Sequence, residues 1–263
     1  MKVRIWLGIG AVLAVAGVTV TWNARTQAAD GVTLVISADG AAKTIDDDIK
    51  ELQKALDLSK VEKRDLRRVR VLAILIAQNS AGLSAAGKGD KAKLAGQHAT
   101  AIAVLDALAK EEGAASLKKI AAGFASAKGD SIKPVDYHKY LFDGMDPDVD
   151  TAMQLYKSTR AGGLGIEKLI KDFSEKAPTA KDMPTIQTAA YRAASITGYL
   201  EQLAPRQDSG KKTKAAWVKF VQDARASAVE TAAAAEKKNL KGVKEGLAKM
   251  DVSCVGCHEV FKK

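Results

Sequence analysis

The amino-acid sequence predicts an all-α protein, and three observations support this fold class. Of the 263 residues, 47% are hydrophobic but only 5% are aromatic. Ala, Lys, Leu and Glu dominate the composition, and these residues favour helices over sheets. The prolines fall between long periodic segments or at their first turn, where a missing N–H does least harm. They are Pro134, Pro147, Pro178, Pro184 and Pro205.

Residues 1–28 are predicted to be a secretory signal peptide. Lys2 and Arg4 precede an apolar run over residues 5–20, and small residues surround Ala28, where cleavage would occur. We therefore expect an exported protein. The apolar run nearly reaches the roughly 17 residues of a short membrane span, so an uncleaved N-terminal anchor is the alternative.

Residues 31–130 are predicted to form a helical bundle. Helices are expected near residues 45–57, 60–82, 91–111 and 114–127. Ser59 and Glu62 have the spacing of a capping box before the second of these, and Asp90 can cap the third. Residues 131–148, which contain Gly144 and two prolines, are expected to be a linker.

Residues 149–263 are predicted to form a second, antiparallel bundle of four helices. The helices are expected near residues 149–173, 183–203, 212–236 and 239–261. Asp182 and Pro184 are suited to open the second of them. The run Gly162-Gly163-Leu164-Gly165 lies within the first, where we favour a break of the helix over close approach to a bound group.

The chemistry of the chain is concentrated in the motif Cys254-Val255-Gly256-Cys257-His258. Cys-x-x-Cys-His is the attachment signature of a c-type haem, in which two thiols bond to the porphyrin vinyl groups and the imidazole binds the iron. On a helix, both thiols and the imidazole lie on one face. A disulfide between these two cysteines would close too small a loop to stabilise the fold.

The residues around the motif predict that it faces a helical core. A seam with alternating steps of three and four runs through the last helix. It consists of Leu240, Val243, Leu247, Met250, Cys254, Cys257 and Phe261. The preceding helix is expected to face it with Trp217, Phe220, Ala224, Ala228, Thr231 and Ala235. The alanines leave room for a porphyrin or are ordinary core contacts.

Two other readings of the motif, and the reading of the chain as an enzyme, are weaker. A thioredoxin-like dithiol belongs at the start of a helix after a strand, whereas this motif lies near a helix end. Zinc would need a fourth ligand, for which only His98, His138 or a carboxylate is available. No Ser/His/Asp arrangement or phosphate-binding loop rises above background, so we do not expect an enzyme.

From about Trp217 to Lys263 the chain resembles the class II cytochromes c, the cytochrome c′ family, which are four-helix bundles. The resemblance rests on two helices that end in the haem motif, followed by Phe261 and Lys262. Family members usually have Arg where Lys262 stands, and the N-terminal half departs from the family pattern. The resemblance implies one covalent haem c, thioether bonds to Cys254 and Cys257, and His258 as the proximal iron ligand.

The first half is interpreted as a copy of the second without the haem motif. A gapless register over the last two helices of each half places Lys91 over Lys214 and Leu117 over Leu240. Ser131, Pro134 and Val135 then take the positions of the motif's Cys254, Cys257 and His258. Helices rich in alanine match this well by composition alone, which is the alternative to duplication.

The function expected from the resemblance is electron transfer by a monohaem cytochrome that is periplasmic or otherwise exported. The alternative is a haem module that binds nitric oxide or carbon monoxide at a vacant sixth iron position. Met153 is the candidate sixth ligand, because it lies on the expected first helix of the haem-bearing bundle; a core methionine is the competing interpretation.

The charge of the chain bears on its partners. Removing Lys2, Arg4 and Arg25 from the 41 basic residues leaves 38 against 31 acidic ones, a formal charge of +7 for the mature chain. We expect an acidic redox partner protein and no nucleic acid, because the basic residues form no concentrated block. Membrane association is expected only if residues 1–28 stay uncleaved, and homodimerisation is left open.

Overall fold

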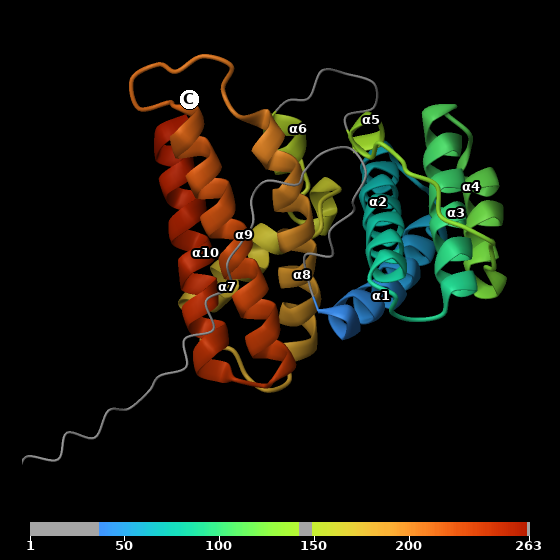
Figure 1. Ribbon diagram of the computed structural model, residues 1–263, viewed down its shortest axis with the longest axis horizontal. Helices are drawn as coiled ribbons and strands as arrows, with labels where there is room; N and C mark the ends of the chain where they lie inside the picture. The colour runs from blue at the N-terminus through green and yellow to red at the C-terminus, as the bar shows by residue number, and fades with distance from the viewer. Residues whose placement is uncertain (1–36, 142–148, 262–263) are drawn as a thin grey trace, which may run out of the picture. The chain divides into compact units, whose positions relative to one another are not determined.

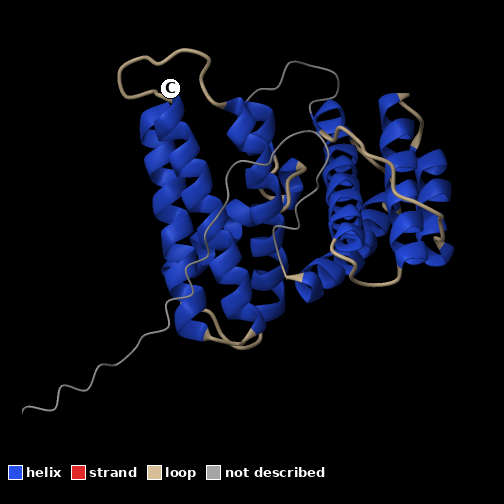
Figure 2. Ribbon diagram, in the orientation of Figure 1, coloured by secondary structure: helices blue, strands red, loops and turns tan. Residues whose placement is uncertain are grey.

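A computed structural model describes residues 37–141 and 149–261, and every regular element in these ranges is a helix (Figures 1 and 2). The described ranges contain no strand, only an isolated bridge between Ser209 and Lys212. The all-α prediction is therefore confirmed. The predicted signal peptide lies outside the described residues. None of the described helices is long and apolar enough to cross a membrane.

The first half contains a closed series of helix contacts. Its helices are α1 (Ala38–Leu56), α2 (Lys63–Ala85), α3 (Lys91–Ala109) and α4 (Ala114–Ala122), which continues as the 3-10 helix η1 (Gly123–Ser126). Each packs on the next, and α4 packs back on α1. The apolar faces meet in one core that includes Leu52, Leu72 and Leu117.

The helix starts follow local hydrogen bonds. α1 begins well before the expected residue 45, because the Ser37 hydroxyl accepts a hydrogen bond from Gly40 N at 3.0 Å. α2 has a capping box, but its partners are Glu62 and Asp65 rather than Ser59 and Glu62. Asp90 caps α3 as predicted, accepting from Lys93 N at 3.0 Å.

The expected linker is partly structured. Its residues 138–141 form the short helix α5 (His138–Leu141), and Tyr137, Tyr140 and Leu141 are buried. α5 packs on α2. Residues 142–148 lie outside the described part of the chain.

The helix expected over residues 149–173 is interrupted, which confirms the break predicted at the glycine run. The segment forms α6 (Val149–Gln154), the 3-10 helix η2 (Thr159–Ala161) and α7 (Ile166–Glu175). Gly162 and Gly165 have φ of 83° and 76°, which side chains rarely adopt. A Cβ atom on Gly162 would also lie 2.5 Å from the Arg64 carbonyl oxygen. The bend therefore requires these glycines.

The second half repeats the closed series of contacts. α7 packs on α8 (Met183–Leu200), which continues as η3 (Glu201–Leu203); α8 packs on α9 (Lys214–Glu236), α9 on α10 (Leu240–Phe261), and α10 back on α7 (Figure 1). α6 packs on α8. Asp182 precedes α8, but its carboxylate accepts from Thr179 N at 2.8 Å instead of capping the helix.

The two halves contact each other through α1 and α8. Arg192 on α8 donates from Nε to Asp48 Oδ1 at 2.7 Å and from Nη1 to Glu51 at 3.3 Å. Asp48 is fully buried and Arg192 nearly so. Beside them, the Tyr191 hydroxyl lies 3.0 Å from Ser37 Oγ. A buried ion pair thus lies in the contact between these two helices.

The starts of α3 and α9 agree with the predicted register. Lys91 and Lys214 each begin a helix, and the preceding residue caps it in both cases. Gly87 and Gly210, four residues before these starts, both have positive φ, of 66° and 56°. The gapless register therefore holds up to this point.

The gapless register is wrong beyond the end of α3, because α9 has 23 residues and α3 has 19. In the helix that follows in each half, three buried residues are spaced by four and then three positions. By this spacing, Leu117, Ala121 and Phe124 correspond to Val243, Leu247 and Met250. This shifts the second helix pair by three residues from the gapless register. The helical path of the first half ends at Ser126, just before residues 128–132, which correspond to the Cys-x-x-Cys-His motif in the shifted register.

Candidate functional site

The motif lies in the last turns of α10, a helix whose start and buried face are well defined. The Asn239 side chain accepts a hydrogen bond from Gly242 N at 3.1 Å, capping the first turn. Val243, Leu247 and Met250 are buried, as the seam predicted. Leu240, the first residue of that predicted seam, is 44% exposed, so the buried face begins one turn later.

The three predicted haem residues lie on one helix but differ in exposure. Cys254 and Cys257 are half-buried free thiols, and Cys257 packs against the core. His258 is exposed. With about 3.6 residues per turn, the two sulfurs and the imidazole lie within one sector of the helix surface. The imidazole of His258 is therefore exposed to solvent, whereas the two thiols are partly buried.

The electrostatics of the thiols favour the protonated form. Burial raises the pKa of the Cys254 thiol to about 11, with smaller contributions from Asp251, Cys257 and Glu167. Burial also raises the pKa of Cys257. A dithiol that exchanges disulfides needs a lowered thiol pKa, supplied by a helix N-terminus or a nearby cation. These surroundings are therefore the opposite of a thioredoxin-like site.

Aromatic residues of α9 hold the end of α10 that carries the motif. Trp217 Nε1 donates to the Leu200 carbonyl at 2.7 Å, which fixes the indole between α8 and α9. The Phe261 ring meets the Trp217 ring edge-on at 5.0 Å and the Phe220 ring at 6.5 Å. A Cβ atom on Gly256 would lie 2.8 Å from the Phe220 ring, so the glycine inside the motif permits this close helix contact.

The inward face of α9 is rotated from the expected one. Trp217, Ala228, Thr231 and Ala235 are buried as predicted. Between them, Val221 and Arg225 are buried in place of Phe220 and Ala224. Desolvation lowers the pKa of Arg225, with an opposing contribution from Glu201. The guanidinium lies near Gly198 of α8. A buried arginine was missed because arginine is ordinarily assigned to the surface.

Two residues outside the motif are coupled to it electrostatically. The charge of Glu167 on α7 adds to the raised pKa of the Cys254 thiol, and Cys254 adds to the raised pKa of Tyr156, which follows α6. Desolvation raises the pKa of Tyr156, whose hydroxyl lies 2.8 Å from Thr197 Oγ1 on α8. The folded glycine turn joins these two residues, since Glu167 N donates to the Tyr156 carbonyl at 2.8 Å.

Met153 lies on α6, three residues before Tyr156, and is half-buried against the core. α6 packs on α8, and it is α7 that packs on α10. The core-facing residues of α7 are all apolar. They are Ile166, Leu169, Ile170 and Phe173. The structure therefore places apolar side chains on the helix that faces the motif helix.

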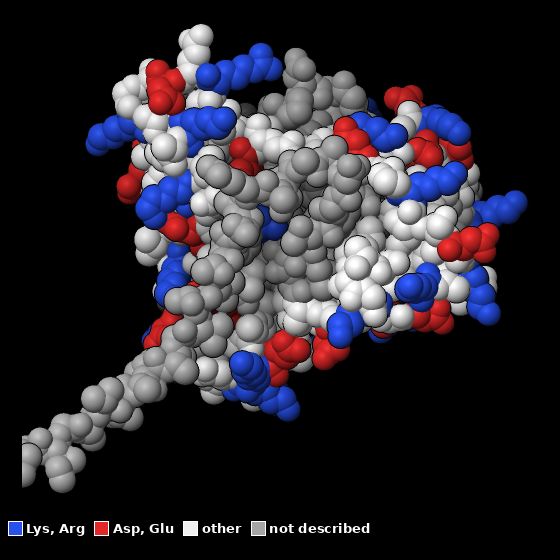
Figure 3. All heavy atoms as spheres, viewed as in Figure 1, with Lys and Arg blue, Asp and Glu red and all other residues white. Residues whose placement is uncertain are grey.

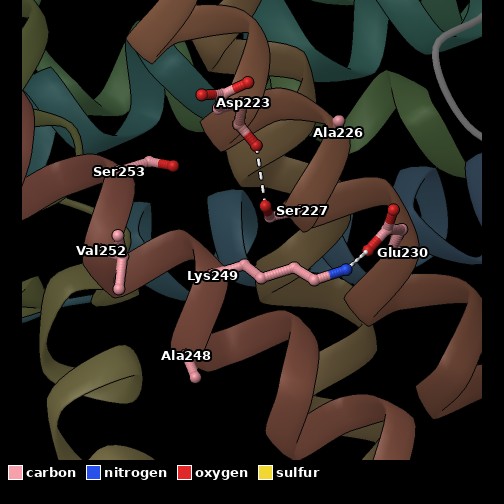
Figure 4. Close-up of a pocket in the computed structure, with 8 residues that line it drawn as sticks. All are labelled: Asp223, Ala226, Ser227, Glu230, Ala248, Lys249, Val252 and Ser253. Atoms are coloured by element: carbon pink, nitrogen blue, oxygen red, sulfur yellow. Dashed lines mark hydrogen bonds and ion pairs between the residues drawn. The ribbon is translucent and has the colours of Figure 1, made fainter.

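A shallow groove of about 460 Å³ runs between α9 and α10 beside the motif (Figure 4). The lining residues are Asp223, Ala226, Ser227, Glu230, Ala248, Lys249, Val252 and Ser253. Lys249 Nζ and Glu230 Oε2 are 2.7 Å apart across it, and Ser227 donates to the Asp223 carbonyl. The motif cysteines and histidine do not line this groove.

The other histidines have structural contacts. His98 is buried, with Nε2 3.1 Å from the Tyr137 hydroxyl. His138 lies edge-on to the Tyr199 ring at 5.0 Å. Within residues 37–141 and 149–261, no group of three or more His, Cys, Asp or Glu side chains is placed to hold a metal ion. A haem iron needs only one or two protein ligands, because the porphyrin supplies four nitrogens.

The surface shown in Figure 3 carries basic and acidic side chains interspersed, without a basic block. Comparison of the chain with protein-family models, curated proteins and solved structures finds no match. Function is therefore inferred from the residues of α10 and their surroundings.

Proposed function

We propose that this protein is a c-type cytochrome, periplasmic or otherwise exported, with one covalent haem that acts in electron transfer. The observation that carries the proposal is the setting of the motif: Cys254 and Cys257 are half-buried, free and less than a turn apart, and His258 follows at once. Each thiol would add its sulfur and its hydrogen across one porphyrin vinyl group. His258 would bind the iron.

The surroundings of the motif fit a haem in three ways. Cys257 packs against the core and Cys254 is half-buried, which suits a mostly apolar ring. α7 faces α10 with apolar side chains, and Trp217, Phe220 and Phe261 support the motif's last turn. The bound haem would supply one-electron chemistry at its iron, while the chain would attach it, orient it and limit its contact with water.

The closed contacts of α7, α8, α9 and α10 support a four-helix bundle of the cytochrome c′ type as the haem-bearing part. We further propose that the first half is a copy without haem. The similar contact series of α1 to α4 supports this, as do the matching starts of α3 and α9. An acidic redox partner protein remains the proposed partner of the basic mature chain.

The apolar face of α7 favours a second candidate function, the binding of nitric oxide or carbon monoxide. A sixth position without a protein ligand is open to a small gas, although it also permits electron transfer. Met153 remains the proposed sixth ligand in the electron-transfer reading.

The test is expression of the full chain with a c-type maturation system, followed by mass spectrometry and spectroscopy of the denatured protein. We expect one haem mass to stay on the chain under acid and organic solvent. Cys254→Ala with Cys257→Ala should abolish attachment. Haem that is fully extracted, or a mature wild-type chain without haem, would refute the proposal.

A further inference from the structure

The start of α2 exposes a group of basic side chains. They are Lys60, Lys63, Arg64 and Arg67. The two acidic residues among them are already engaged in local structure. Glu62 and Asp65 form the capping box of α2, and Glu62 also lies 3.1 Å from Arg64 Nη2. The positive charge of this surface is therefore only partly compensated.

A segment of the second half adds two more bases. η2 packs on α2. Gly162, directly after η2, is so close to Arg64 that a Cβ atom on it would lie 2.5 Å from the Arg64 carbonyl oxygen. Lys157 and Arg160, just before and within η2, are exposed. The prediction that the basic residues form no concentrated block is wrong at this place, because η2 reaches α2 only in the fold.

The turn that carries Lys157 and Arg160 is fixed by its own backbone. Gly165 N donates to the Lys157 carbonyl at 2.7 Å. A Cβ atom on Gly163 would clash with the same carbonyl oxygen, so the chain is tightly folded here. A surface that is ordered before binding loses less conformational entropy when a partner docks.

The bases of the two segments form one exposed surface, the α2–η2 patch. It consists of Lys60, Lys63, Arg64, Arg67, Lys157 and Arg160. These six basic residues and the acidic Glu62 and Asp65 give a formal charge of +4. Arg64 pairs with Glu62, and the other five bases have no ion-pair partner among the described residues. Exposed cations that are unpaired within the chain attract an anionic partner.

The chemistry of the patch favours an acidic protein over other anions. Apart from Leu58, residues 57–67 and 157–160 expose no large apolar side chain, whereas a helix that binds a membrane surface buries an apolar face in the lipid. Export, predicted from residues 1–28, argues against nucleic acid. Carboxylates on a protein surface can pair with the separate bases around Glu62 and Asp65.

We infer that the α2–η2 patch is the docking surface for the acidic redox partner, and that the first half, which lacks the haem motif, serves in partner recognition. The inference rests on the proposed function and adds the place where the partner binds. The first half supplies four of the six bases. η2 leads into α7, the helix that packs on α10, so a partner on the patch contacts both halves.

The experiment titrates labelled polyglutamate, as an acidic polypeptide, into the full-length protein at about 0.1 M salt, where the Debye length is about 10 Å. Arg67→Gln with Arg160→Gln should weaken binding by about two- to thirtyfold, the size expected for two exposed ion pairs. Carbodiimide coupling of the bound polyglutamate, mapped by mass spectrometry, should occur at Lys60, Lys63 and Lys157.

Lys88→Gln with Lys91→Gln is the matched control, because it removes the same charge from exposed lysines beyond the other end of α2. α2 has 23 residues, so its two ends are about 35 Å apart, more than three Debye lengths at this salt concentration. The control should change the affinity by less than about twofold.

Equal affinities of wild type and patch variant, an equal loss in both variants, or coupling at Lys88 and Lys91 instead would overturn the inference. A patch variant that loses binding to phosphatidylglycerol vesicles or duplex DNA but not to polyglutamate would assign the patch to another class of partner and also overturn it. Polyglutamate binding needs no haem. Patch-dependent binding by a chain without covalent haem would therefore defeat the proposed function and leave the docking surface for an acidic protein intact.

Discussion

The ion pair between Arg192 and Asp48 makes the stability of the contact between α1 and α8 dependent on pH. Burial, opposed by the attraction of Arg192, raises the pKa of Asp48 from its ordinary 3.8 to about 6. The folded chain thus binds this proton more tightly than the unfolded chain. Protonated Asp48 therefore contributes about 3 kcal/mol to the free energy of unfolding. This contribution is complete below pH 3.8 and is lost as the pH rises through 6.

Arg192→Met tests this reasoning. At pH 7 the variant leaves the Asp48 carboxylate buried without its cation, and such a loss costs about 3–5 kcal/mol in the free energy of unfolding. At pH 5 Asp48 is largely protonated in the fold, so the cost should be lower than at pH 7 by about 1.4 kcal/mol, the most that a pKa of about 6 allows between these pH values. Guanidinium unfolding at both pH values measures the difference.

Arg68→Met is the control for this experiment. Arg68 pairs with Glu51 of the same α1 face, but its side chain is 21% exposed, so the loss should cost about 1 kcal/mol or less at either pH. A cost for Arg192→Met that is below about 1 kcal/mol at pH 7, or equal at both pH values, would refute the argument from burial.

Three further predictions concern the second half. His258→Ala should keep the covalent haem but change the optical spectrum of the iron strongly; equal spectra would remove His258 as the ligand. If the Met153 thioether binds iron, Met153→Ala should open the sixth position to carbon monoxide and lower the reduction potential. If the wild type already binds carbon monoxide rapidly and the variant does not change this, the gas-binding function is favoured. Gly256→Ala places a Cβ 2.8 Å from the Phe220 ring and should destabilise the fold by about 1–3 kcal/mol in thermal unfolding. Gly113→Ala, whose Cβ meets nothing within 4 Å, should have little effect.

The sequence predicted the long helices well, because their apolar spacing and caps are local properties. Helices α2, α3, α8, α9 and α10 lie close to their expected ranges. The start of α1 was missed, because the Ser37 cap also depends on Tyr191 in a distant helix. The register of the halves was wrong beyond α3, since composition alone does not reveal the extra turn of α9.

The residues of the candidate site likewise fall into those that a local motif predicts and those that only the packing of distant segments brings together. Cys254, Cys257 and His258 form a local motif, and its side chains lie on one helix as expected. Tyr156 and Glu167 are joined through their backbones only because positive-φ glycines reverse the chain before α7. Arg225 was missed because its burial depends on the packing of α8 on α9. Nothing in the local sequence of these three residues marks them.

The early end of η1 limits how the first half could be re-engineered. After Ser126 the chain lies across α3, where Gly129 N donates to the Ala92 carbonyl at 2.9 Å. A Cβ on Gly96 would lie 2.2 Å from Lys128 N, so this crossing leaves no space for another helical turn. Grafting a second Cys-x-x-Cys-His sequence at this point would supply the thiols without the helix that aligns them. A two-haem derivative would need the crossing rerouted and α4 lengthened first.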